Sequence, residues 1–299
     1  MVKTVLIVGL GSIGQRYARL LREIYGNKIN IIALRTRGLK FSINEDFTIN
    51  KDMSPEKKYN IISFSRINEL VKNSKISHAI ICSPPNKHIS DVIKILKFCK
   101  PKILIEKPIS HKSSEIKKIV DKYKSHSKNI YISQQLRYSP LISKIKKLLN
   151  NRVFGKISYA SFIFSEYLPL MHPYEDYLKS HASIKRKGGG VVLNLNHDID
   201  IMFYLFGMPS AVVGMENKNN ILNIDCEESV NLIYKYKKRN NDFNCRVDLD
   251  FIGKPTKREW KIIGEKGSIT IDLISSTYHL LTHNKGKILV NDKNKIRFG

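Results

Sequence analysis

Apolar residues form short continuous runs in the first half of the chain, and a stretch with helical periodicity follows each run. Residues 4–10 are almost uniformly apolar and have the length of a strand, which is typical of a central parallel strand covered on both faces. After the segment GLGSIG, apolar residues recur at helical spacing from Ile13 to Ile24, and a second apolar run follows at 29–35. This order predicts a parallel sheet with helices between its strands.

The alternation of strand and helix continues to about residue 137. An apolar run ends in CSPPNKH at 82–88, an amphipathic helix is expected at 91–99, and the next strand at 102–106 is stopped by Pro108. A helix at 113–124 and a strand at 129–137 complete this half. Because the carboxyl ends of parallel strands meet at one edge, we expect Gly9, Ser83 and Lys107 to face the ligand.

The spacing of the first glycines indicates a nucleotide site. Gly9, Gly11 and Gly14 form a GxGxxG turn between a predicted strand and a predicted helix, where glycine permits a tight turn and the helix N-terminus offers N–H groups to a pyrophosphate. A glycine turn without a nucleotide and the loop of a methyltransferase are the alternatives.

The end of the second strand discriminates between nucleotides. An NAD enzyme usually places Asp or Glu there, whereas this chain has Arg35, Thr36 and Arg37. Two guanidinium groups can pair with a 2′-phosphate, so the sequence favours NADP, with NAD as the alternative cofactor, and predicts at least roughly tenfold tighter binding of NADPH than of NADH. The competing interpretation is that both arginines are ordinary surface cations.

Beyond residue 150 the periodicity changes from helical to alternating. In NCRVDLDF, Cys245, Val247, Leu249 and Phe251 alternate with polar residues, which predicts a strand with one buried and one wet face. Similar runs lie at 156–167, 210–215, 228–237, 259–267 and 268–273. We therefore predict an α/β plus α+β protein, with a Rossmann dinucleotide-binding domain at 1–130 and a substrate-binding and oligomerisation domain with an open, mainly antiparallel sheet at 131–299.

One helix is predicted to interrupt the second sheet, between the glycines at 188–190 and Gly207. Its apolar stripe comprises Val192, Leu195, Ile199, Met202 and Phe206. Asn194, His197 and Asp200 are expected together on the other side, facing either the nicotinamide or solvent.

The 299 residues carry 52 Lys and Arg against 26 Asp and Glu, a net charge of +26. The cations are dispersed along the chain, so the charge favours anionic small substrates over a specific nucleic-acid partner. The four cysteines form no CxxC pair, which indicates a reducing cytoplasm and neither a zinc site nor a disulfide scaffold. No apolar run approaches the roughly 18 residues that would suggest a membrane partner.

Six ordered motifs then identify a family. GLGSIGQRY, CSPPNKH, ILIEKPIS, QQLRYSP, GGGVVLNLNHDIDIMFYLFG and IIGEKGSITIDL together resemble the Gfo/Idh/MocA oxidoreductases. The resemblance implies a nicotinamide-dependent dehydrogenase or reductase of a sugar, a nucleotide sugar or a related polyol, with Lys107 and His197 as acid–base groups. The segment YLPLMHPYEDY resembles a branch associated with bacterial surface-polysaccharide biosynthesis.

The same matching gives the remaining candidate residues. Arg137 follows QQL, where the resemblance implies a loop near the nicotinamide, and a salt bridge is its alternative role. The predicted cofactor contacts are Gly9, Gly11, Ser12, Ile13, Gly14, Arg35, Thr36, Arg37, Cys82, Ser83, Pro84, His88, Glu106, Lys107 and Arg137. The predicted substrate contacts are His172, Glu175, Asp176, Tyr177 and Asp200. No metal site is predicted, since the spacing of His172, Asp176 and His181 does not support one.

Two departures from the family pattern open an alternative. Asn194 stands where the family commonly has Asp before the histidine, and an amide can orient an imidazole without neutralising it. The C-terminal segment of the family also has no counterpart before KNKIRFG, so we expect a short or truncated chain. The alternative is therefore a catalytically inactive nucleotide-binding sensor or scaffold. The resemblance also implies a homodimer or homotetramer formed through the second sheet.

Overall fold

The computed structural model describes residues 2–35, 38, 40–73, 75–238, 240–282 and 285–291, and the chain divides into two compact units. The first unit comprises Met1–Ser133 with two later segments, His172–Asp176 and Arg186–Gly188. The second comprises Gln134–Met171, Tyr177–Lys185 and Gly189–Gly299. The domain boundary predicted at residue 130 stays a prediction. A single boundary there assigns the two later segments of the first unit to the second domain.

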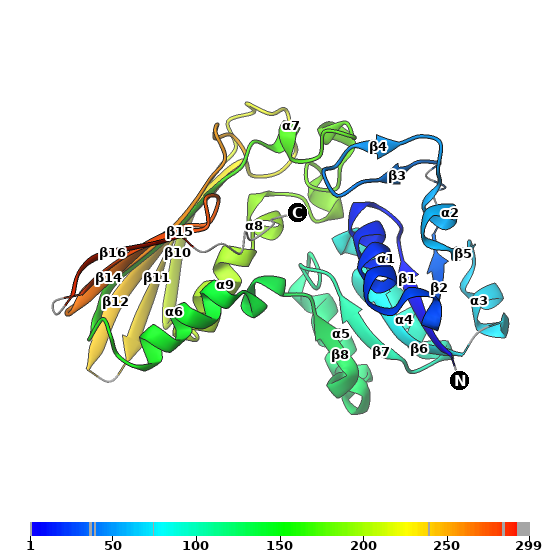
Figure 1. Ribbon diagram of the computed structural model, residues 1–299, viewed down its shortest axis with the longest axis horizontal. Coiled ribbons are helices and arrows are strands. Elements are labelled where there is room, and N and C mark those ends of the chain that lie inside the picture. The colour runs from blue at the N-terminus through cyan, green and yellow to red at the C-terminus, as the bar shows by residue number, and fades with distance from the viewer. Residues whose placement is uncertain are drawn as a thin grey trace. The chain divides into compact units, whose positions relative to one another are not determined.

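A six-stranded sheet forms the centre of the first unit, and all its neighbouring strands are parallel (Figure 1). Its spatial order is β5 (Ile61–Phe64), β2 (Ile29–Leu34), β1 (Lys3–Val8), β6 (Ile76–Ile81), β7 (Lys102–Ile105) and β8 (Ile130–Ile132). Numbered along the chain, these strands lie in the order 3-2-1-4-5-6 of dinucleotide-binding folds, which confirms the predicted Rossmann architecture.

Both faces of this sheet are covered, which explains the uniformly apolar first strand. On β1, Leu6 and Val8 belong to the core formed with α4 (Pro85–Phe98) and α5 (Ser113–Lys122), whereas Val5 and Ile7 belong to the core formed with α1 (Ser12–Tyr25). Since alternate side chains of a strand point to opposite faces, burial on both sides requires apolar residues at consecutive positions. The helices of this unit are α1 (Ser12–Tyr25), α2 (Pro55–Tyr59), α3 (Ile67–Asn73), α4 (Pro85–Phe98) and α5 (Ser113–Lys122).

The region between β2 and β6 contains elements that the sequence pattern did not predict. A two-stranded hairpin, β3 (Ser42–Ile43) and β4 (Ile49–Asn50), precedes α2, β5 and α3. The buried Gln15 of α1 accepts a hydrogen bond from the Ile43 amide at 2.7 Å, which fixes the hairpin to the helix. These elements are too short to show a clear hydrophobic period.

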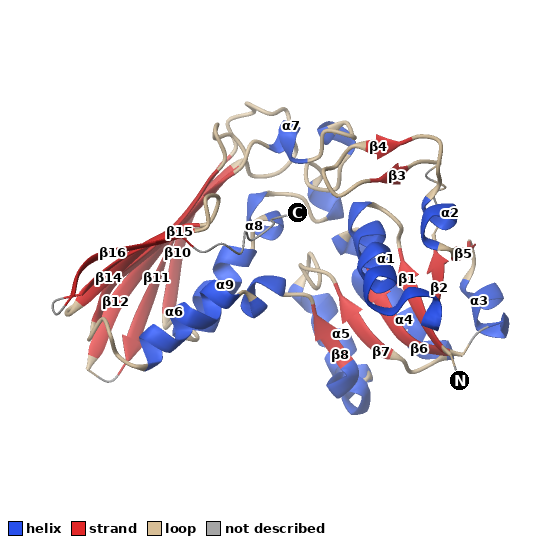
Figure 2. Ribbon diagram, in the orientation of Figure 1, coloured by secondary structure: helices blue, strands red, loops and turns tan. Residues whose placement is uncertain are grey.

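The second unit is built on an eight-stranded sheet (Figure 2). In this sheet β12 (Asn241–Asp250) and β9 (Ile157–Ser165) are parallel, and the other neighbours are antiparallel. The mainly antiparallel sheet predicted from the alternating residues is therefore confirmed. Its last two strands were not predicted. The spatial order is β10 (Ala211–Asn217), β11 (Ser229–Lys238), β12 (Asn241–Asp250), β9 (Ile157–Ser165), β13 (Lys257–Gly264), β14 (Gly267–Asp272), β15 (Thr277–Thr282) and β16 (Lys285–Asn291).

Helices cover one face of this sheet, and their apolar side chains share one core with its strands. Ile142 and Ile145 of α6 (Pro140–Asn150) and Met202 of α9 (His197–Phe206) are fully buried in that core. The helices are α6 (Pro140–Asn150), α7 (Leu168–Met171), α8 (Val191–Asn194) and α9 (His197–Phe206), and the short 3₁₀ segments of the chain are η1 (Gly26–Lys28), η2 (Lys124–Asn129), η3 (Gln135–Tyr138), η4 (Tyr177–Lys179) and η5 (Lys185–Lys187). Within the described ranges, no helix combines the length and the apolar character needed to cross a membrane.

The prediction of one helix from residue 191 to Gly207 is wrong, because Leu195 and Asn196 separate α8 from α9. Leu195 leaves the helical region with φ −95° and ψ 23°. The Asn194 side chain also donates to the Gly190 carbonyl at 2.7 Å, a local bond of the kind that competes with helix propagation. The break changes the phase of the buried face, so the predicted stripe is only partly correct and Asp198 is fully buried.

A buried polar cluster fixes α9 to β13. The Asp198 carboxylate accepts from Arg258 Nη2 at 2.8 Å and from Trp260 Nε1 at 2.5 Å, and all three side chains are at most 1% exposed. The Arg258 guanidinium also lies over the Phe164 ring, 4.3 Å from its centroid. Each charge is therefore partnered inside the core, which a buried ion pair requires.

We predict that Arg258→Met lowers the free energy of unfolding of the second unit by about 3–5 kcal/mol, because Asp198 would remain charged and buried without its guanidinium. Arg246→Met is the matched control. Arg246 pairs with Asp248 at 2.6 Å but is 49% exposed, so its loss should cost less than about 1 kcal/mol. Urea unfolding followed by Trp260, the single tryptophan, measures both. Equal midpoints for the two variants would contradict the prediction.

Candidate active site

The glycine turn joins the end of β1 to the start of α1, and its geometry requires glycine at two of its three positions. Gly9 has φ +90°, and a Cβ there would lie 2.9 Å from the Cys82 carbonyl oxygen. A Cβ on Gly14 would lie 2.0 Å from the Gly9 carbonyl oxygen. These two glycines therefore allow the helix to start directly against the strand.

Gly11 has a different surrounding, because a Cβ built on it meets no atom within 4 Å. The backbone at Gly11, Ser12 and Ile13 begins the 14-residue helix α1, whose first N–H groups have no partners within the helix. Open space above an exposed helix N-terminus suits the pyrophosphate of a dinucleotide, which needs close backbone approach and N–H donors. The residues present at this turn thus fit a nicotinamide dinucleotide.

The neighbouring strand ends extend the same edge of the sheet. Cys82 donates its amide to the Val8 carbonyl at 2.8 Å, and Glu106 donates to the Ile81 carbonyl at 3.0 Å. The ladder therefore continues one residue past each strand and brings the segments that start at Gly9, Cys82 and Glu106 to one edge. Burial raises the pKa of the Cys82 thiol well above its usual range, which disfavours the reactive thiolate form.

Glu106 links three elements at this edge. Its carboxylate accepts from the Tyr17 hydroxyl at 2.6 Å and from the Lys107 amide at 3.1 Å, and Tyr17 also contacts the Ser133 hydroxyl at 2.9 Å. Burial, and then the Glu106 charge, raises the pKa of Tyr17 above its usual range. Tyr17 therefore stays a neutral donor and fixes the backbone that carries Lys107.

His88 of α4 is buried and contacts the backbone that follows two of these strand ends. Its Nδ1 is 2.9 Å from the Pro108 carbonyl and its Nε2 is 2.5 Å from the Ser83 carbonyl. Burial lowers the pKa of this imidazole. Both ring nitrogens contact backbone, so the structure shows His88 connecting the turn after β6, where Ser83 and Pro84 lie, to the turn after β7.

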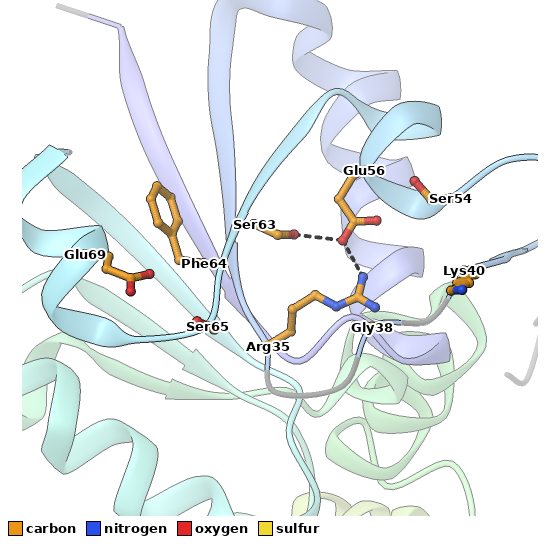
Figure 3. A pocket seen from close by; sticks show the side chains of 9 residues that line it. All are labelled: Arg35, Gly38, Lys40, Ser54, Glu56, Ser63, Phe64, Ser65 and Glu69. Atoms are coloured by element: carbon orange, nitrogen blue, oxygen red, sulfur yellow. Dashed lines mark hydrogen bonds and ion pairs between the residues drawn. The ribbon is translucent and has the colours of Figure 1, made fainter.

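A pocket of about 610 Å³ lies at the ends of β2 and β5 (Figure 3). Arg35 borders it, and its guanidinium is 2.5 Å from the Glu56 carboxylate. Thr36 and Arg37, the other residues predicted to bind the adenosine end, lie outside the described residues. Glu56 could not be selected from the sequence, because an acid on a five-residue helix beyond the hairpin carries no signal that links it to Arg35.

In the second unit, His197 begins α9 and Asn194 ends α8, and both are 9% exposed. Gln135 Nε2 lies 3.4 Å from His197 Nε2, a contact that orients the imidazole through η3. Asp200, one turn after His197, receives two hydrogen bonds from Arg137, at 2.8 and 2.5 Å. Asp200 raises the pKa of Arg137. The structure thus gives Arg137 the salt bridge weighed as its alternative role, and contact of Arg137 with a cofactor stays a prediction.

The loop predicted to bind substrate is divided between the units. His172, Glu175 and Asp176 belong to the first unit, where His172 Nδ1 lies 3.3 Å from the Glu175 carboxylate. Tyr177 belongs to the second unit, where its hydroxyl donates to the Leu222 carbonyl at 3.2 Å. Their roles toward a substrate stay predictions.

Tyr174, which no sequence motif singles out, lies beside the glycine turn. Tyr174 forms a side-chain hydrogen bond with Ser12, and burial raises the pKa of Tyr174 to about 12. Its ring stacks on Phe47 of the β3–β4 hairpin, with centroids 6.4 Å apart, and His172 contacts both rings. No sequence period connects positions 47 and 174, so only the fold could bring them together. Among the described residues, no group of three or more His, Cys, Asp and Glu could hold a metal ion.

Two family models match most of the chain. The model described as oxidoreductase family, NAD-binding Rossmann fold, matches residues 3–134, and the model of the GFO/IDH/MocA C-terminal domain matches residues 142–270. A curated relative, oxidoreductase P35 of Formosa agariphila, is 24% identical over 210 residues, which cover 70% of this chain and 63% of that protein. The chain spans less than two thirds of the length of the curated relatives it matches.

Solved structures share the fold at low identity. The WlbA dehydrogenase of Bordetella pertussis, in complex with NADH and UDP-GlcNAcA, has a TM-score of 0.72 and 15% identity, over 90% of this chain and 77% of that chain. A levoglucosan dehydrogenase in complex with NADH and L-sorbose has a TM-score of 0.76 and 16% identity, over 97% and 80% of the two chains.

The contrast between Gly11 and Gly14 gives a prediction. Gly14→Ala should lower the melting temperature strongly, because its Cβ would overlap the Gly9 carbonyl oxygen. Gly11→Ala should melt like the wild type, since its Cβ enters open space. It should bind NADPH and NADH at least about tenfold more weakly, because we expect the pyrophosphate to approach the backbone through that space. Thermal melting and fluorescence titration measure the two effects. Unchanged cofactor affinity in Gly11→Ala would contradict this assignment.

Proposed function

The chain belongs to the Gfo/Idh/MocA oxidoreductase family, and on that premise we propose that it is a nicotinamide-dependent dehydrogenase or reductase of a sugar, a nucleotide sugar or a related polyol. The observation that carries the proposal is the turn at Gly9–Gly14, where a tight strand–helix contact leaves open space above the start of α1. The ligands of two structural neighbours, UDP-GlcNAcA and L-sorbose, support a carbohydrate as the substrate class.

The proposed chemistry assigns separate roles to Lys107 and His197. A bound nicotinamide ring supplies or accepts a hydride, so the carbohydrate oxygen must gain or lose a proton as its charge changes. We assign Lys107 to stabilise the alkoxide-like oxygen, because a cation beside developing negative charge lowers the barrier. His197 is assigned to exchange the proton, because an imidazole titrates near neutral pH. Asn194 is assigned to the same site.

We further propose that NADP is preferred over NAD. Arg35 supports this preference, since its guanidinium borders the pocket at the end of β2 and can pair with a 2′-phosphate. Thr36 and Arg37 belong to the same proposal on sequence grounds alone. NADH occupies the two neighbouring structures described above, so NAD stays the alternative cofactor.

For the substrate, we propose contacts from the residues around the 172–177 loop and from α9. The Glu175 carboxylate and the His172 ring form a polar pair 3.3 Å apart that can exchange hydrogen bonds with sugar hydroxyls. Asp176, Tyr177 and Asp200 complete the proposed set. A role in surface-polysaccharide biosynthesis rests on the resemblance of residues 167–177 to one branch of the family.

An inactive sensor or scaffold is the second candidate, and Asn194 favours it. Its amide donates to Gly190 and carries no charge, so it cannot stabilise an imidazolium on His197 as an aspartate would. Both candidates bind the cofactor, and they differ in turnover.

We predict that Lys107→Ala and His197→Ala each lower turnover by at least about a hundredfold, because acid–base groups typically contribute 10²–10⁴-fold. Cofactor affinity should change little in His197→Ala. The assay follows NADPH absorbance against a panel of free and nucleotide-activated sugars. Lys112→Ala and His279→Ala, at exposed positions, are the matched controls. Cofactor binding without turnover on any member of the panel would favour the sensor.

We also propose a homodimer or homotetramer formed through the open face of the second sheet. Val213 of the edge strand β10 is 67% exposed and is paired with Ile233 of β11, which is 46% exposed. On β11, the side chains of Val230, Tyr234 and Tyr236 are buried. Ile233 lies on the opposite face of the same strand, so the Val213–Ile233 pair faces away from the core. An apolar pair on an open sheet favours association.

Val213→Glu is accordingly predicted to shift the protein to a monomer, because a charge cannot be buried unpaired in an interface. Multi-angle light scattering measures the mass. Ile24→Glu, on the first unit and 69% exposed, should leave the mass unchanged. A wild-type protein that is already monomeric would refute this part of the proposal.

A further inference from the structure

The pocket at the ends of β2 and β5 contains an acid that the expected role of Arg35 does not require. Figure 3 shows Glu56 reaching into the pocket from α2, where one carboxylate oxygen accepts from Arg35 Nη1 at 2.5 Å and from the Ser63 hydroxyl at 2.9 Å. The Arg35 side chain is 7% exposed and that of Glu56 is 27% exposed. The two charges are therefore paired in a partly buried place.

Local structure fixes Glu56 in this position. Ser54 caps α2 and Pro55 starts it, which places Glu56 in the first turn, where an acid is favoured by the helix dipole. The C-terminal end of α2 is held by Arg22, which donates to the Tyr59 carbonyl at 2.7 Å and to the Asn60 carbonyl at 2.8 Å. The carboxylate is thus presented to Arg35 by an anchored helix.

The pair changes the electrostatics that a 2′-phosphate would meet. Among the described residues that line the pocket, Arg35 and Lys40 are cations and Glu56 and Glu69 are acids, so the formal charges of this part of the lining cancel. A phosphate monoester carries nearly two negative charges at pH 7. To pair with Arg35, the 2′-phosphate must either displace the Glu56 carboxylate or lie next to it. In both cases part of the electrostatic attraction between the phosphate and Arg35 is lost. A 2′-hydroxyl can instead donate to the carboxylate.

We propose that Glu56 is the residue that sets the choice between NADP and NAD, an inference that rests on the proposed function and extends it. Glu56 competes with the 2′-phosphate for Arg35 and accepts the 2′-hydroxyl of NAD. Glu56 thereby keeps the ratio of NADPH to NADH affinity lower than Arg35 alone would give. The protein uses both cofactors, and the Arg35–Glu56 ion pair sets this ratio.

The test compares dissociation constants of NADPH and NADH, measured by fluorescence titration without substrate. Glu56→Gln keeps the shape and both hydrogen-bond partners of the side chain but removes its charge. It should raise the NADPH-to-NADH affinity ratio about tenfold over the wild type, the scale of one charge-assisted hydrogen bond. Arg35→Gln should lower the ratio. Glu69→Gln is the matched control, because it removes an acid that lies apart from the Arg35–Glu56 pair in the same pocket, and it should change the ratio less than twofold (Figure 3).

The outcomes separate the inference from the proposed function. If the wild type binds neither cofactor, the proposed function fails and the inference fails with it. If both cofactors bind and Glu56→Gln leaves the ratio unchanged, only the inference fails. An equal rise in Glu56→Gln and Glu69→Gln would also overturn it, because the net charge of the pocket would then decide the ratio. Should Glu56→Gln melt early, Glu56→Asp keeps the charge but withdraws it from Arg35, and it should raise the ratio by a smaller factor.

Discussion

The close approach of β1 to α1 is the constraint on which the nucleotide-binding half of this protein depends. A side chain at Gly14 would occupy the position of the Gly9 carbonyl oxygen, and one at Gly9 would press on the Cys82 carbonyl. Because both are absent, the helix begins at the edge of the sheet and its free N–H groups face the same side as the strand ends. Tyr17, on the second turn of that helix, can then reach Glu106 and fix the backbone of Lys107.

In the second unit, the main constraint is that α9, a short helix with several polar residues, packs against an apolar sheet. Asp198 makes this possible, since its carboxylate is satisfied by Arg258 and Trp260 inside the core. A buried ion pair contributes little net stability compared with apolar packing, but each buried charge must keep its partner within the core. That requirement fixes the rotation of α9, and with it the positions of His197 and Asp200 within this unit.

The partners of a charged residue say more about its role in this protein than the net charge does. The net charge of +26 says little about function, because most of the lysines are dispersed and solvated. The Arg35–Glu56 and Arg137–Asp200 pairs are local and geometrically defined, and each neutralises an arginine that the sequence alone presents as available for a ligand. A cation's role thus depends on an acid that can lie more than twenty or even sixty residues away along the chain.

The sequence by itself determined the class of both sheets and the position of the glycine turn, because strand burial and tight turns leave local signals: an apolar run, strict alternation, and Gly9, Gly11 and Gly14 at fixed spacing. It did not determine the break between α8 and α9, since Asn194 bonds to its own backbone and Asp198 finds its partners sixty residues later. It also could not place Glu56 on Arg35, or Tyr174 on Ser12. Such contacts join residues that share no period, so only the tertiary structure decides them.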